Sequence, residues 1–308
     1  MLLLTGATGL VGRSLLRRLT ATGRPVRCLV RDPRGLGADR VRVQIALGDL
    51  ADPPSFRNAM RGVSTVVHLA AAIRDQPSGS IEELNGIATW RMVQAAERVG
   101  VEHFVFLSSL SAASHDRTRF LRAKALAERA VLASDVRHTV FAPSLVYAPG
   151  DQLSTFLGRM AMVLPIVPVS GRGQALYQPI WSDDVADCVM AVLGGAGNGR
   201  VRHELAGPET LSQQAIVDLM LQAAGRARPL VNIPTPIVSR VLRATETLMK
   251  SRAPTTWDEV ELLEVSMTSR HGTSDVEELG VTPRRMAAVL GASGYSTLAP
   301  AAIATPRR

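Results

Sequence analysis

The amino-acid sequence predicts an α/β fold in which a doubly wound parallel sheet is joined to a smaller C-terminal α/β region. Three observations predict it. Short apolar runs, typical of buried parallel strands, alternate with amphipathic helices through the first half of the chain. A loop with three regularly spaced glycines separates the first apolar run from the first helix. Beyond residue 150 the alternation becomes looser, which indicates a change of architecture.

The first part of the sheet is predicted from the alternation itself. The leucine run at 2–4 forms a strand, and a helix follows at 13–21, where Leu15, Leu16 and Leu19 fall on one side. Gly23-Arg-Pro25 then turns the chain into the next strand. The elements that continue this pattern are strands at 26–30, 41–46, 65–69 and 101–107, and helices at 54–60 and 81–99.

The remaining elements divide the chain into two regions. Ser182 and Asp183 are good N-terminal caps for a helix that ends at Leu193. The other elements are helices at 120–132, 153–164, 212–224 and 236–250, strands at 137–141 and 201–205, and a Pro/Gly-containing excursion at 165–173. We predict a nucleotide-binding domain at 1–150, completed by roughly 178–200, a smaller region at 151–177 and 201–293, and a disordered tail at 294–308.

The three glycines of the first loop predict a nucleotide site. Gly6 permits a tight turn off the strand, Gly9 lets backbone N–H groups approach a pyrophosphate, and Gly12 lets the helix pack close to the sheet. The N-terminus of the following helix offers unpaired N–H groups and the positive end of its dipole to phosphate. A purely structural turn is the alternative.

The end of the second strand bears on the choice of cofactor. An NAD site usually has an acidic residue here that binds the ribose 2′-hydroxyl, and Val30 stands in that place. Arg31, with Arg34 near it, can instead bind a 2′-phosphate bidentately. Asp32 comes one residue too late for the ribose and can pair with a neighbouring arginine. We therefore expect NADP(H) in preference to NAD(H).

Residues at two further strand ends are candidates for cofactor contacts. The carboxylate of Asp49 can accept a hydrogen bond from the adenine amino group, or it can cap the next helix. Small residues at Ala70 and Ala71 leave room for the nicotinamide ribose. His68 lies inside a strand pattern, and we interpret it mainly as a packed residue rather than a chemical one.

Composition limits the function classes. The net charge is +8, but 33 of the 35 basic residues are arginines spread along the chain, which indicates a genomic bias rather than a nucleic-acid surface. Cys28 and Cys188 are the only cysteines and have no metal-ligand spacing, so we expect no metal and a reducing cytoplasm.

No apolar run is long enough to span a membrane, and the apolar start is too short for a signal peptide. The amphipathic helix at 236–250 could lie on a membrane surface, cover a cleft or form a subunit contact.

Motifs spread over residues 1 to about 190 resemble the short-chain dehydrogenase/reductase superfamily, in its extended and atypical branches, which implies a Rossmann fold. They are Thr5-Gly-Ala-Thr-Gly-Leu-Val-Gly12, Leu29-Val-Arg-Asp32, Gly48-Asp-Leu50, His68-Leu-Ala-Ala71, Ser108-Ser109 with Lys124, Pro143-Ser-Leu-Val-Tyr147 and Gln178-Pro-Ile-Trp-Ser-Asp-Asp-Val-Ala186. The later segments His203-Glu-Leu-Ala-Gly-Pro208 and Glu278-Leu-Gly-Val281 are similar to the subgroup around the nucleotide-binding accessory subunit of respiratory complex I.

The resemblance implies a set of site residues and shows one departure. Ser108 or Ser109 corresponds to the serine that polarises the substrate oxygen, and Lys124 to the lysine of the Tyr-x-x-x-Lys pair. The tyrosine position is Phe120, which has no proton to give, and Tyr147, Tyr177 and Tyr295 do not stand at helical spacing to replace it. The implied cofactor contacts are Thr5, Gly6, Thr8, Gly9, Leu10, Val11, Gly12, Arg31, Asp49, Leu50, Leu69, Ala70, Ala71, Lys124, Pro143, Ser144 and Val146.

Two functions of different classes are compatible with this departure. The first is an NADP(H)-dependent reductase of a hydrophobic carbonyl, quinone or enone that takes its proton from water, Lys124 or His115. The second is a redox-inert NADP(H)-binding structural, sensor or assembly protein whose C-terminal region contacts a partner. An epimerase or dehydratase is a minor alternative, since it needs the missing tyrosine more. Ile166, Val167, Leu176 and Trp181 are the apolar residues expected near a hydrophobic substrate.

Overall fold

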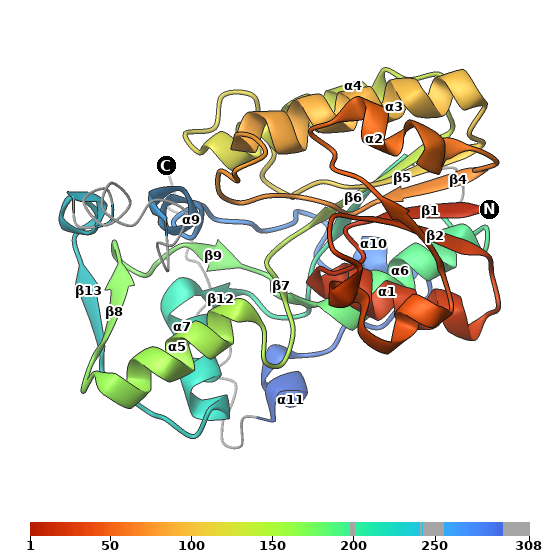
Figure 1. Ribbon diagram of the computed structural model, residues 1–308. Helices are drawn as coiled ribbons and strands as arrows, with labels where there is room; N and C mark the ends of the chain where they lie inside the picture. The colour runs from red at the N-terminus through yellow and green to blue at the C-terminus, as the bar shows by residue number, and fades with distance from the viewer. Residues whose placement is uncertain (198–200, 241, 243–255, 292–308) are drawn as a thin grey trace, which may run out of the picture.

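The main body of the protein is a seven-stranded parallel sheet (Figure 1). The computed structural model describes residues 1–197, 201–240, 242 and 256–291. The strand order is β11-β6-β5-β4-β1-β2-β3, and every neighbouring pair is parallel, which confirms the doubly wound Rossmann fold. The strands are β1 (Leu2–Thr5), β2 (Val26–Val30), β3 (Gln44–Leu47), β4 (Thr65–His68), β5 (His103–Leu107), β6 (His138–Pro143) and β11 (Arg202–Leu205).

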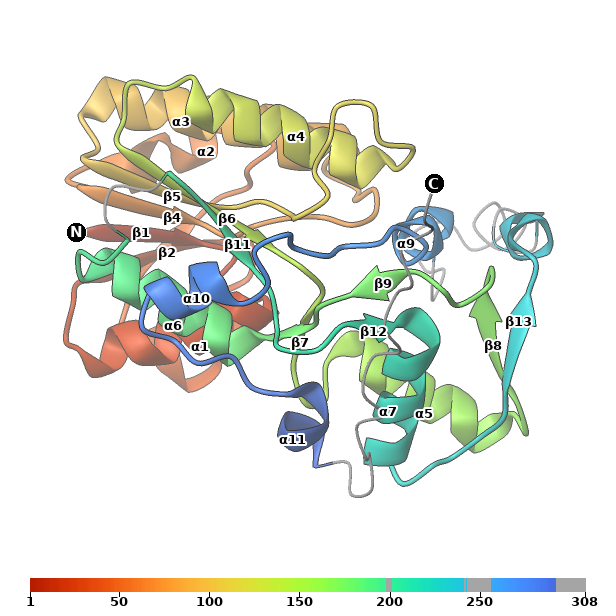
Figure 2. The same cartoon turned by 180° about the vertical axis from the view of Figure 1, so that it is seen from behind.

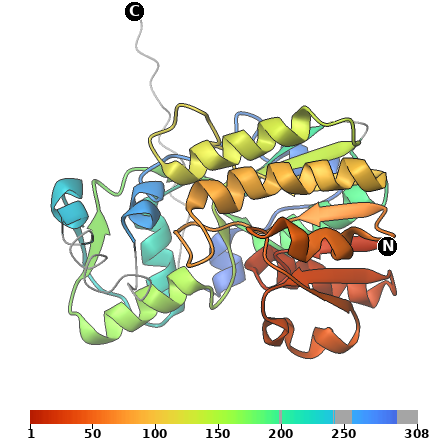
Figure 3. The same cartoon turned by 45° about the horizontal axis from the view of Figure 1, so that its top comes forward.

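Helices cover both faces of this sheet because its strands are apolar on both sides. In β1, Leu2 and Leu4 join the core on one face and Leu3 joins the core on the other, as the period of two requires. One face packs against α1 (Leu10–Ala21) and α6 (Ser182–Leu193). The other face packs against α2 (Pro53–Arg57), α3 (Ala88–Val99) and α4 (Arg119–Leu132), and Figure 3 shows α3 and α4 side by side.

The smaller region lies beside the carboxyl ends of the strands (Figure 2). It has its own apolar core, which includes Tyr147, Tyr177 and Leu219. Three strand pairs build it: β7 (Val146–Tyr147) with β10 (Ile180–Trp181), β8 (Val167–Ser170) with β13 (Leu230–Ile233), and β9 (Leu176–Tyr177) with β12 (Leu211–Ser212). Its helices include α5 (Gln152–Val163), α7 (Gln213–Ala223), α9 (Trp257–Leu262) and α11 (Met286–Leu290), whereas α10 (Ser274–Glu278) packs against β11.

Several element boundaries differ from the sequence prediction. The third strand begins at Gln44, because Pro33–Val41 forms 3₁₀ turns that Gly37 interrupts with a φ of 59°. The predicted helix at 81–99 opens with a π-helical turn at Glu83–Ile87, and α2 ends in a 3₁₀ turn at Asn58–Met60. β8 forms within the predicted excursion at 165–173. β11 is an edge strand of the main sheet, which corrects its assignment to the smaller region. Most of the predicted helix at 236–250 and all of the tail at 294–308 lie outside the described residues.

The predicted caps of α6 are wrong. Its N-cap is Trp181, which makes no side-chain capping bond, while Ser182 and Asp183 lie in the first helical turn. The carboxylate of Asp183 is instead held by α1, where Ser14 donates a hydrogen bond to it and Arg17 and Arg18 lie 3.4 and 3.5 Å away. A long-range contact with α1 has therefore replaced the local capping interaction.

Candidate functional site

The glycine loop between β1 and α1 is shaped by backbone contacts that leave no room for side chains. Gly6 has a φ of 73°, and a Cβ placed on it would lie 2.6 Å from the amide nitrogen of Ala70. A Cβ on Gly12 would lie 2.0 Å from the carbonyl oxygen of Gly6. Gly9 differs, because its nearest neighbour would be 3.3 Å away. Gly6 and Gly12 are thus required by the fold, and Gly9 leaves the N-terminus of α1 open to a ligand.

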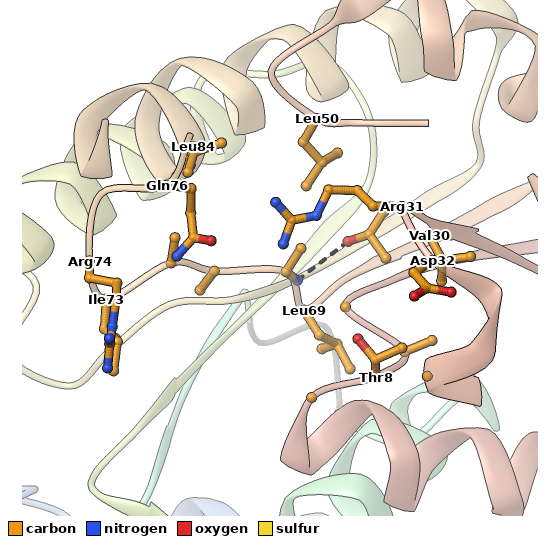
Figure 4. Close-up of a pocket in the computed structure, with 18 of the residues that line it drawn as sticks. Thr8, Val30, Arg31, Asp32, Leu50, Leu69, Ile73, Arg74, Gln76 and Leu84 are labelled. Atoms are coloured by element: carbon orange, nitrogen blue, oxygen red, sulfur yellow. Dashed lines mark hydrogen bonds between the residues drawn. The ribbon is translucent and has the colours of Figure 1, made fainter. Parts of the chain in front are cut away.

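A cavity of about 1350 Å³ runs along the carboxyl ends of β1, β2, β3 and β4 (Figure 4). The residues that the sequence predicted as cofactor contacts and that line it are Thr5, Gly6, Thr8, Gly9, Arg31, Asp49, Leu50, Leu69, Ala70 and Ala71. They come from three separate strand ends and from the glycine loop. The parallel sheet therefore brings the motifs together at one edge, as the fold class predicts.

At one end of the cavity, Arg31 is placed to meet an anion. Figure 4 shows its side chain extending into the cavity beside Leu50, and the part of the chain that the structure describes offers it no ion-pair partner. Arg34 is already engaged, since its guanidinium holds both carboxylate oxygens of Asp32 at 2.8 to 3.0 Å. Asp32 pairs with a neighbouring arginine, as expected. Of these two arginines, Arg31 is the one without an ion-pair partner among the described residues, and its binding of a 2′-phosphate stays a prediction.

Asp49 lines the cavity and does not cap a helix. Its Oδ1 accepts a hydrogen bond of 3.0 Å from the amide of Ala51, and the N-cap of α2 is Asp52. The capping interpretation is therefore wrong. The contact with adenine remains a prediction.

His68 is a packed residue, as the sequence indicates. It is fully buried, and its ring nitrogens lie 2.8 Å from the hydroxyl of Thr5 and 3.0 Å from that of Thr89. Burial lowers the pKa of the imidazole to about 3, so the ring is neutral. Thr5 also accepts a hydrogen bond of 3.4 Å from the amide of Ala70, the dashed line in Figure 4. The chain Thr5–His68–Thr89 thus ties β1 to β4 and α3 beneath the cavity.

The residues that correspond to the usual catalytic group lie outside the lining of the cavity. The helix does place Phe120 beside Lys124, whose Nζ is 5.8 Å from the centre of the Phe120 ring and 4.9 Å from that of Phe106. This buried ammonium donates a hydrogen bond of 2.7 Å to the carbonyl of Leu107. Ser108 donates one of 2.5 Å to Glu128. Both of these polar groups are therefore occupied by interactions within the protein.

A segment near the C-terminus explains why other predicted residues are covered. The Sδ atom of Met267 lies 3.9 Å from the Oγ of Ser109, and its carbonyl accepts a hydrogen bond of 2.6 Å from Ser144. Its own amide donates to the carbonyl of Leu176 at 2.8 Å, so the segment is fixed in place. No local pattern around Met267 predicts this contact. The predicted residues that do not line the cavity are Ser108, Ser109, Lys124, Leu10, Val11, Gly12, Pro143, Ser144 and Val146.

The other half of the cavity was missed by sequence reasoning. It is lined by the loop after β4, which Asn85 holds by hydrogen bonds to Ala72, and by one face of α5. The residues that line this half include Ile73, Arg74, Gln76, Leu84, Gln152, Thr155, Phe156, Arg159 and Glu259. The i, i+3, i+4, i+7 spacing of the four α5 residues was a usable signal. The apolar residues predicted for this place, Ile166, Val167, Leu176 and Trp181, are not among the lining residues.

An ion pair closes this half of the cavity against α9. Arg74 and Glu259 are 185 residues apart, yet their side chains approach to 2.7 Å. Glu259 also completes a capping box with Thr256, which fixes its carboxylate. Arg119 strengthens the same junction through ion pairs with Asp75, Glu82 and Asp258.

The buried Lys124 predicts a pH dependence of stability. Burial lowers its pKa from 10.5 to about 7, whereas the unfolded chain titrates at the ordinary value. Between these two values the unfolded chain binds more protons than the folded protein, so the free energy of unfolding should rise with pH. We expect Lys124→Met to flatten this rise and to stabilise the fold most below pH 7, measured by urea unfolding across the range. An equal pH slope in both proteins would contradict the assignment of a buried, partly neutral lysine.

Comparison with known proteins agrees with this geometry. Residues 6–162 match the family model described as NAD(P)H-binding. Sterol demethylase protein B of Methylococcus capsulatus is 30% identical over 263 residues, which cover 78% of this chain and 79% of that protein. Ceramide reductase of Caulobacter vibrioides is 30% identical over 206 residues, 65% of either chain. The NADH dehydrogenase [ubiquinone] 1 alpha subcomplex subunit 9 of Arabidopsis thaliana mitochondria is 27% identical over 81% of this chain, which spans 64% of that subunit.

Solved structures show the same fold over nearly the whole chain. The UDP-glucose 4-epimerase of Thermus thermophilus in complex with NAD has a TM-score of 0.71, covers 94% of this chain and is 18% identical in sequence. At that identity the likeness concerns the fold alone. Together with the glycine loop, the sheet order and the match over residues 6–162, it shows that the chain belongs to the NAD(P)H-binding atypical short-chain dehydrogenase/reductases, with an epimerase-like Rossmann fold.

Proposed function

We propose that the protein is an NADPH-dependent reductase of a hydrophobic carbonyl, quinone or enone-type substrate. The observation that carries this proposal is the extent of the cavity, which continues from the glycine loop into a half that contains Ile73, Leu84 and Phe156. Such a half is not needed to hold a nucleotide alone. The ceramide reductase among the relatives supports a reductive chemistry on an apolar molecule.

Each part of the cavity has a distinct role in this proposal. The backbone of the glycine loop would bind the pyrophosphate, and Arg31 the 2′-phosphate that distinguishes NADPH from NADH. Ala70 and Ala71 would leave room for the nicotinamide ribose. The chemistry that NADPH would supply when bound is hydride donation to an electrophilic carbon. The apolar side chains of the other half would hold the substrate against that position.

Water is the proton source that the geometry favours. Phe120 carries no proton, the Nζ of Lys124 is bonded to Leu107, and His115 is exposed and absent from the cavity lining. Exposed polar residues such as Gln152 and Arg159 line the substrate half, so solvent has access to it. Two-electron reduction of a quinone or enone can take its proton from that solvent. We place this activity in the cytoplasm, which suits the two free, buried cysteines.

A redox-inert NADP(H)-binding protein is the second candidate, and a specific observation favours it. Ser108, Ser109, Lys124 and Ser144 all contact other parts of the protein rather than the cavity. The similarity to a respiratory subunit supports a role in an assembly. An epimerase or dehydratase is disfavoured, because Phe120 occupies the position where its chemistry needs a tyrosine.

Binding and release of NADPH test the reductase against the inert binder. For an exchanging coenzyme we expect micromolar affinity, about −8 kcal/mol, and release faster than a turnover of about 10 per second. Stopped-flow fluorescence with the purified protein measures both, and NADPH oxidation in the presence of a soluble quinone measures hydride transfer. Nanomolar affinity with release over minutes, and no oxidation, would assign the nucleotide a structural role.

Phe120→Tyr tests whether a latent proton-donor position exists. Because Phe120 lies next to Lys124 on α4, the new hydroxyl would stand where the superfamily places its acid, and carbonyl reduction should rise by about 100-fold. The measurement is kcat/KM for a panel of ketones, with Phe120→Leu as the control that adds no hydroxyl. A folded Phe120→Tyr protein with unchanged NADPH affinity and no gain would show that the substrate carbonyl does not reach this position.

A further inference from the structure

The C-terminal end of α5 carries an apolar surface that the protein does not cover. Five consecutive residues, Met162-Val-Leu-Pro-Ile166, are exposed, and Val163 and Met162 are 82% and 62% exposed. In Figure 1 the end of α5 and the start of β8 lie at the edge of the molecule, away from the Rossmann sheet. We call residues 162–166 the apolar tip. It protrudes, so it cannot be explained as part of the core or of the cavity.

Two arginines lie in the loop that is hydrogen-bonded to the residues on either side of this tip. They belong to the exposed loop between α7 and β13, and we call Arg226 and Arg228 the basic collar. The Nε of Arg228 donates a hydrogen bond of 3.2 Å to the carbonyl of Ala161, and the amide of Val167 donates one of 2.9 Å to the carbonyl of Pro229. These bonds hold the loop that carries the collar against the chain on both sides of the tip.

The charge around the tip has a single sign along both chain segments. Residues 152–174 and 219–240 contain five arginines and no aspartate or glutamate. The acidic residues that bound these segments, Asp151 and Asp218, make hydrogen bonds within their own helices, to Ser154 and Gln222. The positive charge of the collar is complementary to an anionic surface, and the exposed apolar side chains of the tip are suited to an apolar layer beneath that surface.

We propose that the apolar tip and the basic collar dock the protein on the surface of an anionic lipid bilayer. The apolar side chains of the tip would enter the boundary between headgroups and acyl chains, and the guanidinium groups of the collar would bind lipid phosphates. None of the helices that the structure describes is long and apolar enough to cross a membrane.

This docking would connect the bilayer to the cavity. The same helix lines the cavity with Phe156 and Arg159, and Val163 stands seven residues beyond Phe156, about 10 Å along the helix axis. The substrate half of the cavity would therefore open near the lipid surface, from which an apolar substrate could be taken. This step rests on the proposed function, whereas the docking itself does not.

Sedimentation with vesicles tests the docking, using the full chain. We expect binding to vesicles that contain phosphatidylglycerol, much weaker binding to pure phosphatidylcholine, and release at high salt. Val163→Asp should weaken binding by about 10-fold or more, and Arg226→Gln/Arg228→Gln by about 10- to 30-fold. The matched controls are Val41→Asp and Arg40→Gln/Arg42→Gln, because Val41 is 81% exposed between two exposed arginines on the Rossmann half.

Three results would overturn the proposal. The first is equal binding to both kinds of vesicle, or none. The second is an equal effect of Val163→Asp and Val41→Asp. The third is that the protein is a dimer, that Val163→Asp converts it to a monomer, and that it does not bind vesicles. This result would assign the tip to a contact between two copies of the chain. NADPH oxidation by a soluble quinone is measured without lipid, so a failure of the proposed function is distinguishable from a failure of the docking.

Discussion

Replacing Gly12 with alanine is expected to displace α1, abolish NADPH binding and lower the free energy of unfolding by about 1–3 kcal/mol or more. The new Cβ would lie 2.0 Å from the carbonyl oxygen of Gly6 and 2.8 Å from the Cα of Ala7. Both neighbours are backbone atoms, so no side chain can move aside. Urea unfolding and fluorescence titration with NADPH measure the two effects.

Gly9→Ala separates cofactor binding from the fold. Its Cβ would lie 3.3 Å from the carbonyl oxygen of Gly6, a tight contact that a shift of a few tenths of an ångström relieves, so the protein should lose far less stability than Gly12→Ala. The methyl group would fill the space where a pyrophosphate meets the N-terminus of α1. We expect NADPH affinity to fall by about 10-fold or more. Gly158→Ala is the benign control, since Gly158 lies within α5 with 3.8 Å to its nearest neighbour, and alanine favours a helix. Normal NADPH binding by Gly12→Ala or Gly9→Ala would place the nucleotide elsewhere.

Replacing Arg31 with glutamine is expected to weaken NADPH binding by about 10- to 100-fold and to leave NADH binding nearly unchanged. The reason is that a bidentate, charge-assisted contact with the 2′-phosphate exists for only one of the two nucleotides. Equilibrium titrations with both nucleotides give the ratio directly.

Arg34→Gln is the matched control for this position. Arg34 is three residues from Arg31 and is also exposed, but its guanidinium is already hydrogen-bonded to Asp32. Its loss should change the NADPH affinity much less than the loss of Arg31. A wild-type protein that prefers NADH, or equal losses for both nucleotides in Arg31→Gln, would refute the assignment of Arg31.

The local features of the site followed from the sequence because they depend on neighbouring residues. The spacing of Gly6, Gly9 and Gly12 implies a turn and an open helix N-terminus wherever such a strand and helix are joined. Arg31 was placed by its distance from that loop. The position of Phe120 relative to Lys124 followed from the period of the helix. These are short-range relations, and the structure reproduces each of them.

The predictions that were wrong concern features that depend on residues far apart in the chain. The sequence predicted Asp183 as a helix cap, but its carboxylate interacts with Ser14 and Arg17 of α1. Ser109 and Ser144 looked available, but Met267 covers both, and nothing near Met267 in the sequence predicts it. The strand at 202–205 looked like part of the smaller region, but its backbone completes the main sheet.

The sequence by itself determined the fold class, the nucleotide end of the cavity and the departure at Phe120, because each is encoded in a period or a spacing of a few residues. Only the tertiary structure decided which polar groups reach the cavity, that its other half is lined by α5, and that an apolar tip stands beside a basic collar. The physical reason is that burial and ion pairing are settled between segments. Arg74 and Glu259, 185 residues apart, meet only because the whole chain has folded.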